Sequence, residues 1–202
     1  DVEIVKPDIP MRKLIPMKRM PPTRLVRYCC SYYKEARGKG RITLTGVRWA
    51  ESVNRRSNQG LVTIIGGNKQ SGTTITGKGC QVLNYDDAEC RRTVESCYRT
   101  AKTMVNPIVD WSDDDVWEYI LSRRTPYCKL YDEGWKRLGC VGCPMGSRTG
   151  MKREFSRWPA IKNVYLRAFD EMLRVRRELQ MPCEWKTAEE VMAWWGGDAA
   201  TA

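Results

Sequence analysis

Residues 41–56 read RITLTGVRWAESVNRR, and this stretch decides the fold class. Its first seven residues are rich in β-branched side chains, and Gly46 stands where the chain would leave a strand, so we expect a buried strand here. Four hydrogen-bond donors follow: Arg48, Ser52, Arg55 and Arg56. In open α/β sheets ligands bind where strands end, and guanidinium groups suit oxyanions. The stretch therefore predicts an anion site, although a solvated Arg-rich turn has the same composition.

The segments around this strand predict a helix-rich α/β fold with few strands. Segments 61–65 and 72–75 could form a short exposed hairpin. Ser112 is placed as the N-cap of a helix whose buried face would hold Val116, Tyr119 and Ile120. Further helices are expected over 23–38, over 86–103, from Pro159 to about Leu179, and from Thr187 to Gly196-Gly197.

Residues 1–22 differ in composition from the rest of the chain. They contain five prolines, at positions 7, 10, 16, 21 and 22, which predicts an extended linker rather than a packed element. We expect residues 23–202 to form the domain that follows this linker.

Composition limits the possible functions. The 35 Lys and Arg against 24 Asp and Glu give a net charge of +11, which favours an anionic partner such as a nucleotide, a nucleic acid or a sulfur oxyanion. The absence of histidine excludes a Ser-His-Asp triad, an HExxH zinc site and Cys2His2 fingers. Because no apolar run is long enough to span a bilayer and no signal peptide is recognisable, we expect a soluble, cytoplasmic protein.

Two cysteine pairs carry the strongest chemical signal. Cys140 and Cys143 have CxxC spacing, which suits one metal ion or two corners of a cluster. Cys29 and Cys30 are adjacent; on a helix they point about 100° apart, which is awkward for one tetrahedral zinc but suits two irons of a cubane. Lys34 lies one helical turn beyond Cys30, where its charge could offset that of a cluster. The spacing favours an iron-sulfur cluster, with zinc and ordinary buried thiols as alternatives.

The same motifs resemble the phosphoadenosine phosphosulfate (PAPS) reductase family. The resemblance spans residues 21–195 and rests on the tandem cysteines with Lys34, the segment from Thr45 to Ser52, the segment from Asn106 to Trp117, and the segment from Gly139 to Pro144. It implies the carboxyl-terminal part of an adenine-nucleotide α-hydrolase-like fold.

The resemblance also implies roles for individual residues. The cysteine pattern is similar to that of the four-iron site in adenylylsulfate reductases, so Cys29, Cys30, Cys140 and Cys143 would bind a [4Fe-4S] cluster. Lys34 would lie between cluster and substrate, and Arg48 would contact the sulfate or phosphate end of an adenine nucleotide. Glu51, Ser52 and Arg55 match the rest of that binding segment. Trp111 and Trp117 would be structural.

The chain departs from the family pattern in two places. The nucleotide-binding Ser-Gly-Gly-x-Asp-Ser loop has no counterpart, so we expect a missing amino-terminal half, or a partner, to supply it, and the fragment alone to be inactive. The family's reductases carry a nucleophilic cysteine in a Glu-Cys-Gly-x-His setting, whereas this chain has Cys183 and no histidine. Reduction of a sulfonucleotide and sulfur transfer to an ATP-activated substrate, as an oxidoreductase or a transferase of sulfur metabolism, both remain open.

Two readings from other functional classes also remain. One is a nucleic-acid-binding module in which four cysteines hold a structural zinc and Arg and Trp side chains form the contact surface. The other is a non-catalytic relative that has lost the first half of the enzyme.

Overall fold

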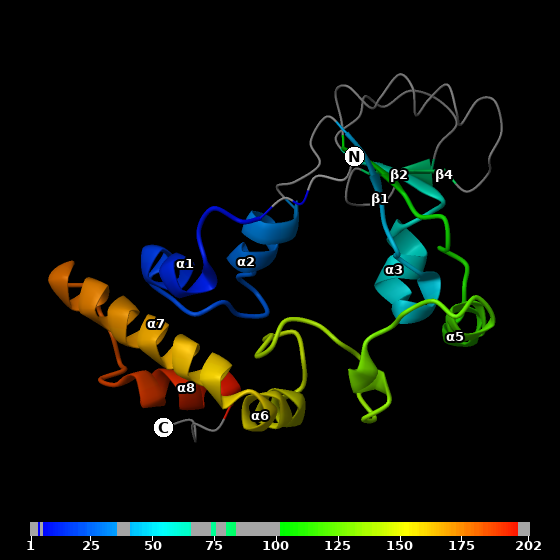
Figure 1. The fold of residues 1–202 in the computed structure, drawn as a ribbon. Helices are drawn as coiled ribbons and strands as arrows, with labels where there is room; N and C mark the ends of the chain where they lie inside the picture. Colours follow the sequence, from blue (N-terminus) through cyan, green and yellow to red (C-terminus); the bar gives the residue numbers. More distant parts are fainter. Residues whose placement is uncertain are drawn as a thin grey trace. The chain divides into compact units, whose positions relative to one another are not determined.

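The computed structural model describes residues 4, 6–35, 41–65, 74–75, 80–83 and 102–197, and the chain divides into two compact units (Figure 1). The first, Asp1–Glu35 with Trp135–Ala202, is called the cysteine unit below because it holds both cysteine pairs. The second, Ala36–Gly134, is called the strand unit. The chain leaves the cysteine unit after Glu35, forms the strand unit and returns at Trp135, and a single domain over 23–202 stays a prediction.

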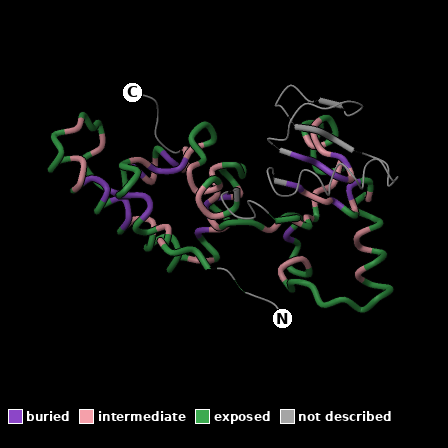
Figure 2. Tube along the Cα trace, turned by 90° about the horizontal axis from the view of Figure 1, so that it is seen from above, coloured by how far each residue is buried: buried purple, intermediate pink, exposed green. Residues whose placement is uncertain are grey.

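The cysteine unit is a small helical assembly around one apolar core. Its helices are α1 (Met11–Lys18), α2 (Tyr28–Cys30) with a π-helical turn at Ser31–Glu35, α6 (Arg148–Arg157), α7 (Pro159–Glu178) and α8 (Ala188–Gly196). Helix α7 packs against α1 and α8, and its buried residues gather with theirs in a single cluster (Figure 2). This core includes Ile15, Phe169, Met172, Val191 and Trp195.

The predicted ends of the last two helices are confirmed. Pro159 opens α7, where its fixed φ and missing N–H cost nothing. The Thr187 hydroxyl accepts a hydrogen bond of 3.3 Å from the Glu190 N–H at the start of α8. Gly197 ends α8 in the left-handed region, with φ of 77°. These local signals suffice because each end depends only on residues within one turn.

Two expectations for the amino-terminal segment are wrong. Met11–Lys18 is helical rather than extended, and Leu14 and Ile15 are fully buried, so burial outweighs the one backbone hydrogen bond that Pro16 removes. The helix expected over 23–38 begins only at Tyr28. Before it, the Thr23 N–H donates to the Val26 carbonyl, and the Val26 N–H donates to the Thr23 hydroxyl. These two hydrogen bonds close a turn.

The strand unit contains a mixed sheet, which confirms the α/β class. Among the described residues the order is β1-β5-β2-β4-β3, with β1 parallel to β5 and the other pairs antiparallel. The strands are β1 (Ile42–Leu44), β2 (Val62–Ile65), β3 (Thr74–Ile75), β4 (Cys80–Leu83) and β5 (Lys102–Val105), with helices α3 (Val53–Asn58) and α5 (Asp113–Ser122).

Several strand predictions need correction. Strand β2 pairs with β4 and β5, and β3 pairs with β4, so 61–65 and 72–75 do not form a hairpin with each other. Val62 and Ile64 are buried, not exposed. Conversely, β1 is not buried: Leu44 is 72% exposed. Most of the helix predicted over 86–103 lies outside the described residues, and Lys102 and Thr103 belong to β5.

The predicted start of α5 is confirmed. The Ser112 hydroxyl accepts from the Asp115 N–H at 3.1 Å, and the Asp115 carboxylate accepts from the Ser112 N–H at 2.7 Å, a reciprocal capping box. These hydrogen bonds lower the pKa of Asp115. The expected buried face is wrong, because none of Val116, Tyr119 and Ile120 is fully buried. Aromatic contacts hold this region instead: Trp111 packs on Tyr119, and Trp117 on Tyr127 and Tyr131.

In the described part of the chain, no helix is both long and apolar enough to cross a membrane.

Candidate cysteine site

The CxxC segment forms a tight turn whose geometry requires glycine. The Cys143 N–H donates to the Cys140 carbonyl at 3.1 Å, and Gly142, at the third position, has φ of 71°, which is the pattern of a type II turn. An ideal Cβ at position 142 would lie 2.5 Å from Cζ of Phe155. Both the backbone conformation and the close approach of Phe155 therefore demand a residue without a side chain.

Side chains from three separate segments hold this turn in place. Arg24 donates from Nε to the Pro144 carbonyl and from its terminal nitrogen to the Gly146 carbonyl, both at 2.9 Å. The Gly142 N–H donates to the Glu154 carboxylate at 2.6 Å. The Tyr165 hydroxyl donates to the Val141 carbonyl at 3.2 Å. The turn is thus fixed by the segment before α2, by α6 and by α7.

The tandem cysteines lie on the short helix α2. Cys29 and Cys30 are half-buried free thiols, and the Cys30 N–H donates to the Arg27 carbonyl at 3.0 Å. The segment before them is anchored twice, because the Tyr28 hydroxyl donates to the Met20 carbonyl at 2.7 Å and Arg24 bonds to the CxxC loop. One short segment therefore carries the first cysteine pair and binds the loop of the second.

Electrostatic interactions link the two pairs. Burial, and after it the charges of Cys30 and Cys143, raise the pKa of Cys29 to about 11. Burial also raises the pKa of Tyr165, and the next contributions come from Cys140, Cys29 and Cys143. Cys29 and Cys143 therefore share one electrostatic neighbourhood, at the Tyr165 side chain. In the free chain the Cys29 thiol therefore stays protonated at neutral pH, so metal binding to its sulfur must release that proton.

The cysteine thiols are the right type of ligand for an iron-sulfur cluster, but the described residues are not already arranged as a site for a metal ion. No group of three or more Cys, Asp or Glu side chains among them is arranged to hold a metal ion. The four cysteines are free, three half-buried and Cys140 exposed, and thiolates are the ligands that iron-sulfur clusters take in proteins. Lys34 is exposed in the π-helical turn after α2. Cys183 is also exposed, with its sulfur 3.4 Å from the Trp185 carbonyl oxygen.

Of the residues predicted to bind an anion or the substrate, Arg48, Glu51, Ser52 and Arg55 lie close together in the strand unit, and each has a partner from the chain, whereas Lys34 belongs to the cysteine unit. Arg48, 14% exposed, forms an ion pair of 2.6 Å with Asp113 at the start of α5 and a hydrogen bond to the Trp111 carbonyl. Arg55 pairs with Glu51, and the Ser52 hydroxyl caps α3 by accepting from the Arg55 N–H at 3.2 Å. In the described structure both guanidinium groups are thus paired with carboxylates of the chain.

A buried polar contact positions this segment. The side-chain amide of Asn106, which is fully buried, donates to the Gly60 carbonyl at 2.6 Å, and its oxygen accepts from the Thr45 hydroxyl. The backbone N–H of Trp49 donates to the Val109 carbonyl at 2.7 Å. The turn after β1 is thereby joined to the segment after β5.

Comparison with known proteins decides the family. Residues 10–145, a range that includes all four cysteines of the two pairs, match the family model described as the phosphoadenosine phosphosulfate reductase domain. The chain belongs to the PAPS reductase family. The family indicated by the motifs is therefore confirmed. No solved structure shows significant similarity to the chain.

The relatives of this PAPS reductase family member match over short stretches. An uncharacterised protein of Methanocaldococcus jannaschii is 37% identical over 92 residues, 44% of this chain and 19% of that protein. An adenosine 5'-phosphosulfate reductase of Neisseria meningitidis is 43% identical over 53 residues, 26% of this chain and 22% of that enzyme. A phosphoadenosine 5'-phosphosulfate reductase of Xylella fastidiosa is 31% identical over 64 residues, 32% and 27% of the two chains. This chain thus covers about a quarter or less of these curated relatives.

Sequence reasoning missed the residues that hold the cysteine turn. Arg24, Glu154 and Tyr165 act through contacts with a distant loop, which no local spacing reveals. Gly142 carried a usable signal, because a glycine at the third position of a four-residue turn predicts a positive φ.

Proposed function

We propose that this chain carries the cluster-binding part of a sulfonucleotide-reductase-like enzyme. The observation that supports this most directly is the pair of hydrogen bonds by which Arg24, five residues before Cys29, holds the loop that carries Cys140 and Cys143. The influence of the Cys143 charge on the pKa of Cys29 agrees with this arrangement.

In this proposal Cys29, Cys30, Cys140 and Cys143 hold a [4Fe-4S] cluster. When bound, such a cluster supplies a charged, redox-active centre whose potential depends on hydrogen bonds to its sulfurs and on its exposure. The chain's own residues prepare the ligands. The type II turn aims Cys140 and Cys143 in fixed directions, while Arg24 and Tyr165 hold the carbonyls of the loop and so preorganise it.

The substrate in this proposal is an adenylyl sulfonucleotide or an ATP-activated acceptor of sulfur. Lys34, one helical turn beyond Cys30, provides a positive charge beside the cluster. Arg48 binds the sulfate or phosphate end of the nucleotide by exchanging its ion pair with Asp113 for the anion, with Glu51, Ser52 and Arg55 forming the rest of that segment. Because Asp113 is exposed, releasing it to solvent costs little.

The ligand assignment is tested by iron content in the full chain purified without oxygen. We expect Cys29→Ala and Cys140→Ser to lose iron and acid-labile sulfide and to destabilise the protein, because metal binding is linked to folding. Cys183→Ala is the matched control, since it removes an exposed thiol of the same unit and should leave the iron content unchanged.

Equal iron in all three variants would overturn the ligand set. A colourless wild-type protein with about one zinc per chain would instead support the zinc-stabilised module.

A further inference from the structure

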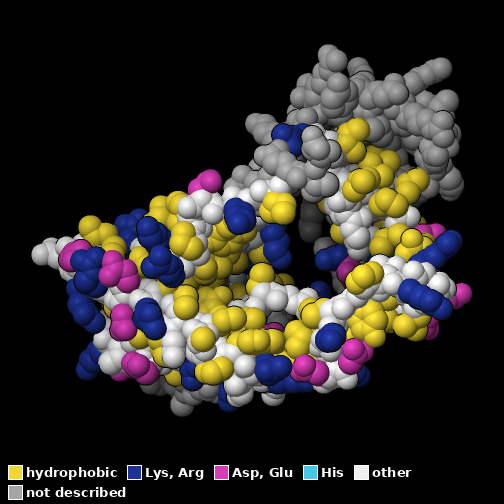
Figure 3. Space-filling model, in the orientation of Figure 1, with side chains coloured by type: hydrophobic (Ala, Val, Ile, Leu, Met, Phe, Trp, Pro, Cys, Tyr) yellow, Lys and Arg dark blue, Asp and Glu magenta, His cyan; other side chains and the backbone are white. Residues whose placement is uncertain are grey.

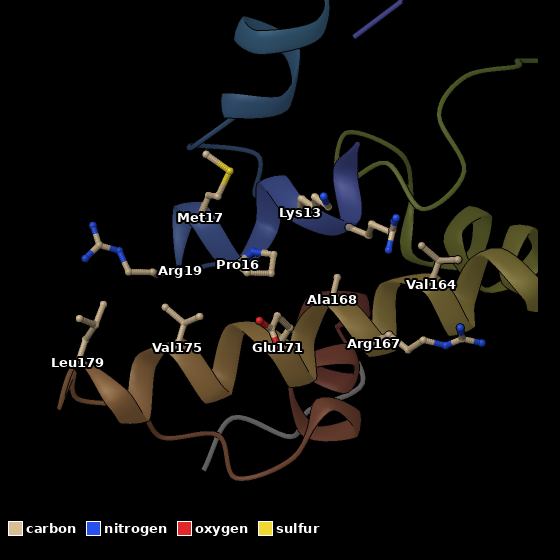
Figure 4. Close-up of a pocket in the computed structure, with 11 residues that line it drawn as sticks. Lys13, Pro16, Met17, Arg19, Val164, Arg167, Ala168, Glu171, Val175 and Leu179 are labelled. Atoms are coloured by element: carbon tan, nitrogen blue, oxygen red, sulfur yellow. The ribbon is translucent and has the colours of Figure 1, made fainter. Parts of the chain in front are cut away.

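An open groove of about 800 Å³ runs between α1 and α7 within the cysteine unit (Figure 4). In Figure 4 the side chains of Val164, Ala168 and Val175 rise from α7 toward α1, and Pro16 points down from α1 toward α7. The apolar residues that line the groove are Pro16, Met17, Val164, Ala168, Val175 and Leu179.

The groove is long and follows one stripe of α7. Its lining positions on that helix, from Val164 through Ala168, Glu171 and Val175 to Leu179, are spaced by three or four residues, so they lie on one face. At 1.5 Å per residue this stripe is about 22 Å long. Such an elongated, open shape suits a helix laid along the groove better than a compact small molecule.

Apolar side chains are left exposed in this groove. Met17 is 58% exposed and Leu179 54%, and Val164 is exposed as well. Figure 3 shows hydrophobic side chains lying between Lys and Arg side chains on this part of the surface. Contiguous exposed apolar surface with a charged rim is typical of an interaction site.

The charge on the rim is almost entirely positive. Four cations line the groove: Arg12, Lys13, Arg19 and Arg167. The single carboxylate lining it, Glu171, is bound by Arg174 through hydrogen bonds of 3.0 and 2.5 Å, and Arg174 also bonds Glu178. Within the described part of the chain, the four cations on the rim form no ion pair. The groove therefore complements an apolar stripe flanked by carboxylates.

We propose that the α1–α7 groove binds an acidic amphipathic helix of a partner protein. Apolar side chains of that helix, spaced three or four residues apart, would contact the floor between Pro16 and Val175. Its Asp and Glu side chains would pair with the cations on the two rims, which raises the association rate and fixes the orientation. This interaction is independent of the proposed cluster and of any nucleotide chemistry.

A synthetic peptide of about 18 residues, long enough at about 27 Å to span the stripe, tests the proposal. It carries Leu at helical spacing and Glu on the other face, and its binding to the full chain is followed by fluorescence anisotropy. One control peptide has the same composition in an order that destroys the apolar stripe, and a second has Lys in place of Glu. We expect the first peptide to bind at least about tenfold more tightly than either control, a difference of about 1.4 kcal/mol.

Two variants then locate the binding site. Arg167→Glu reverses a charge that lines the groove, and we expect it to weaken peptide binding about tenfold, the effect of losing a charged contact. Lys162→Glu is the matched control, because it makes the same charge change on the same helix at a position that does not line this groove; it should change binding less than about twofold.

Three results would overturn the proposal. Equal affinity for the ordered and the scrambled peptide would mean that the net charge of the peptide, and not its apolar stripe, determines binding. Equal effects of the two variants would move the site elsewhere. Concentration-dependent dimerisation that Met17→Glu abolishes would assign the groove to a second copy of the chain.

Discussion

Replacing Gly142 with alanine should destabilise the cysteine unit strongly, because position 142 combines two independent constraints. A residue with a Cβ at φ of 71° costs about 1–2 kcal/mol in the left-handed region. The new methyl group would also lie 2.5 Å from Cζ of Phe155 and 3.3 Å from Trp195, and such overpacking costs about 1–3 kcal/mol. Together we expect a loss of about 2–5 kcal/mol, or a fall in Tm of about 8–20 °C at roughly 4 °C per kcal/mol.

The matched control is Gly139→Ala in the same loop. At position 139 an added Cβ meets nothing within 4 Å, and φ is not positive. Thermal and urea unfolding of the full chain, followed by tryptophan fluorescence, should separate the two variants, with Gly139→Ala close to the wild type. If Gly142→Ala unfolds within about 0.5 kcal/mol of Gly139→Ala, the described turn is not the one the protein forms.

Two further predictions concern the strand unit. Asn106→Ala leaves the Gly60 carbonyl and the Thr45 hydroxyl without a buried partner, so the urea midpoint should fall by the equivalent of about 1–3 kcal/mol; an unchanged midpoint would mean that this contact is not buried. Ser112→Ala removes the cap of α5 and should cost about 1 kcal/mol at neutral pH. Because the pKa of Asp115 is lowered in the folded state by its hydrogen bonds to Ser112, its stabilising contribution is present above its ordinary pKa and is lost as the pH falls through the lowered value. Ser112→Ala keeps the backbone hydrogen bond to this carboxylate and removes the one from the hydroxyl, so the difference in Tm between wild type and Ser112→Ala should narrow on acidification by the contribution of the hydroxyl, and a difference that widens would contradict the capping box.

Helix ends were predictable because their signals are local. Ser112, Pro159 and Thr187 each fix a helix start through atoms within one turn, and all three starts were predicted correctly. The sheet was not predictable in the same way. The placement of β5 between β1 and β2 depends on pairings across long stretches of chain, which carry no short-range pattern.

The amino-terminal segment shows the limit of composition. Five prolines predicted an extended linker, yet Leu14 and Ile15 are buried where α1 packs against α7, and their burial decides the conformation. The residues of the candidate site also fall into a group that the sequence revealed and a group that it did not. The spacing identified the two cysteine pairs as candidate ligands, whereas Arg24 and Tyr165, which hold the loop, could be found only once the backbone was folded.

X-ray absorption at the iron and zinc edges of the full chain, purified without oxygen, tests the central claim most directly. If Cys29, Cys30, Cys140 and Cys143 hold a [4Fe-4S] cluster, iron should be present with sulfur neighbours only in its first shell and a second shell of iron. A zinc edge with four sulfur neighbours and no iron, or iron surrounded by oxygen and nitrogen, would contradict the account.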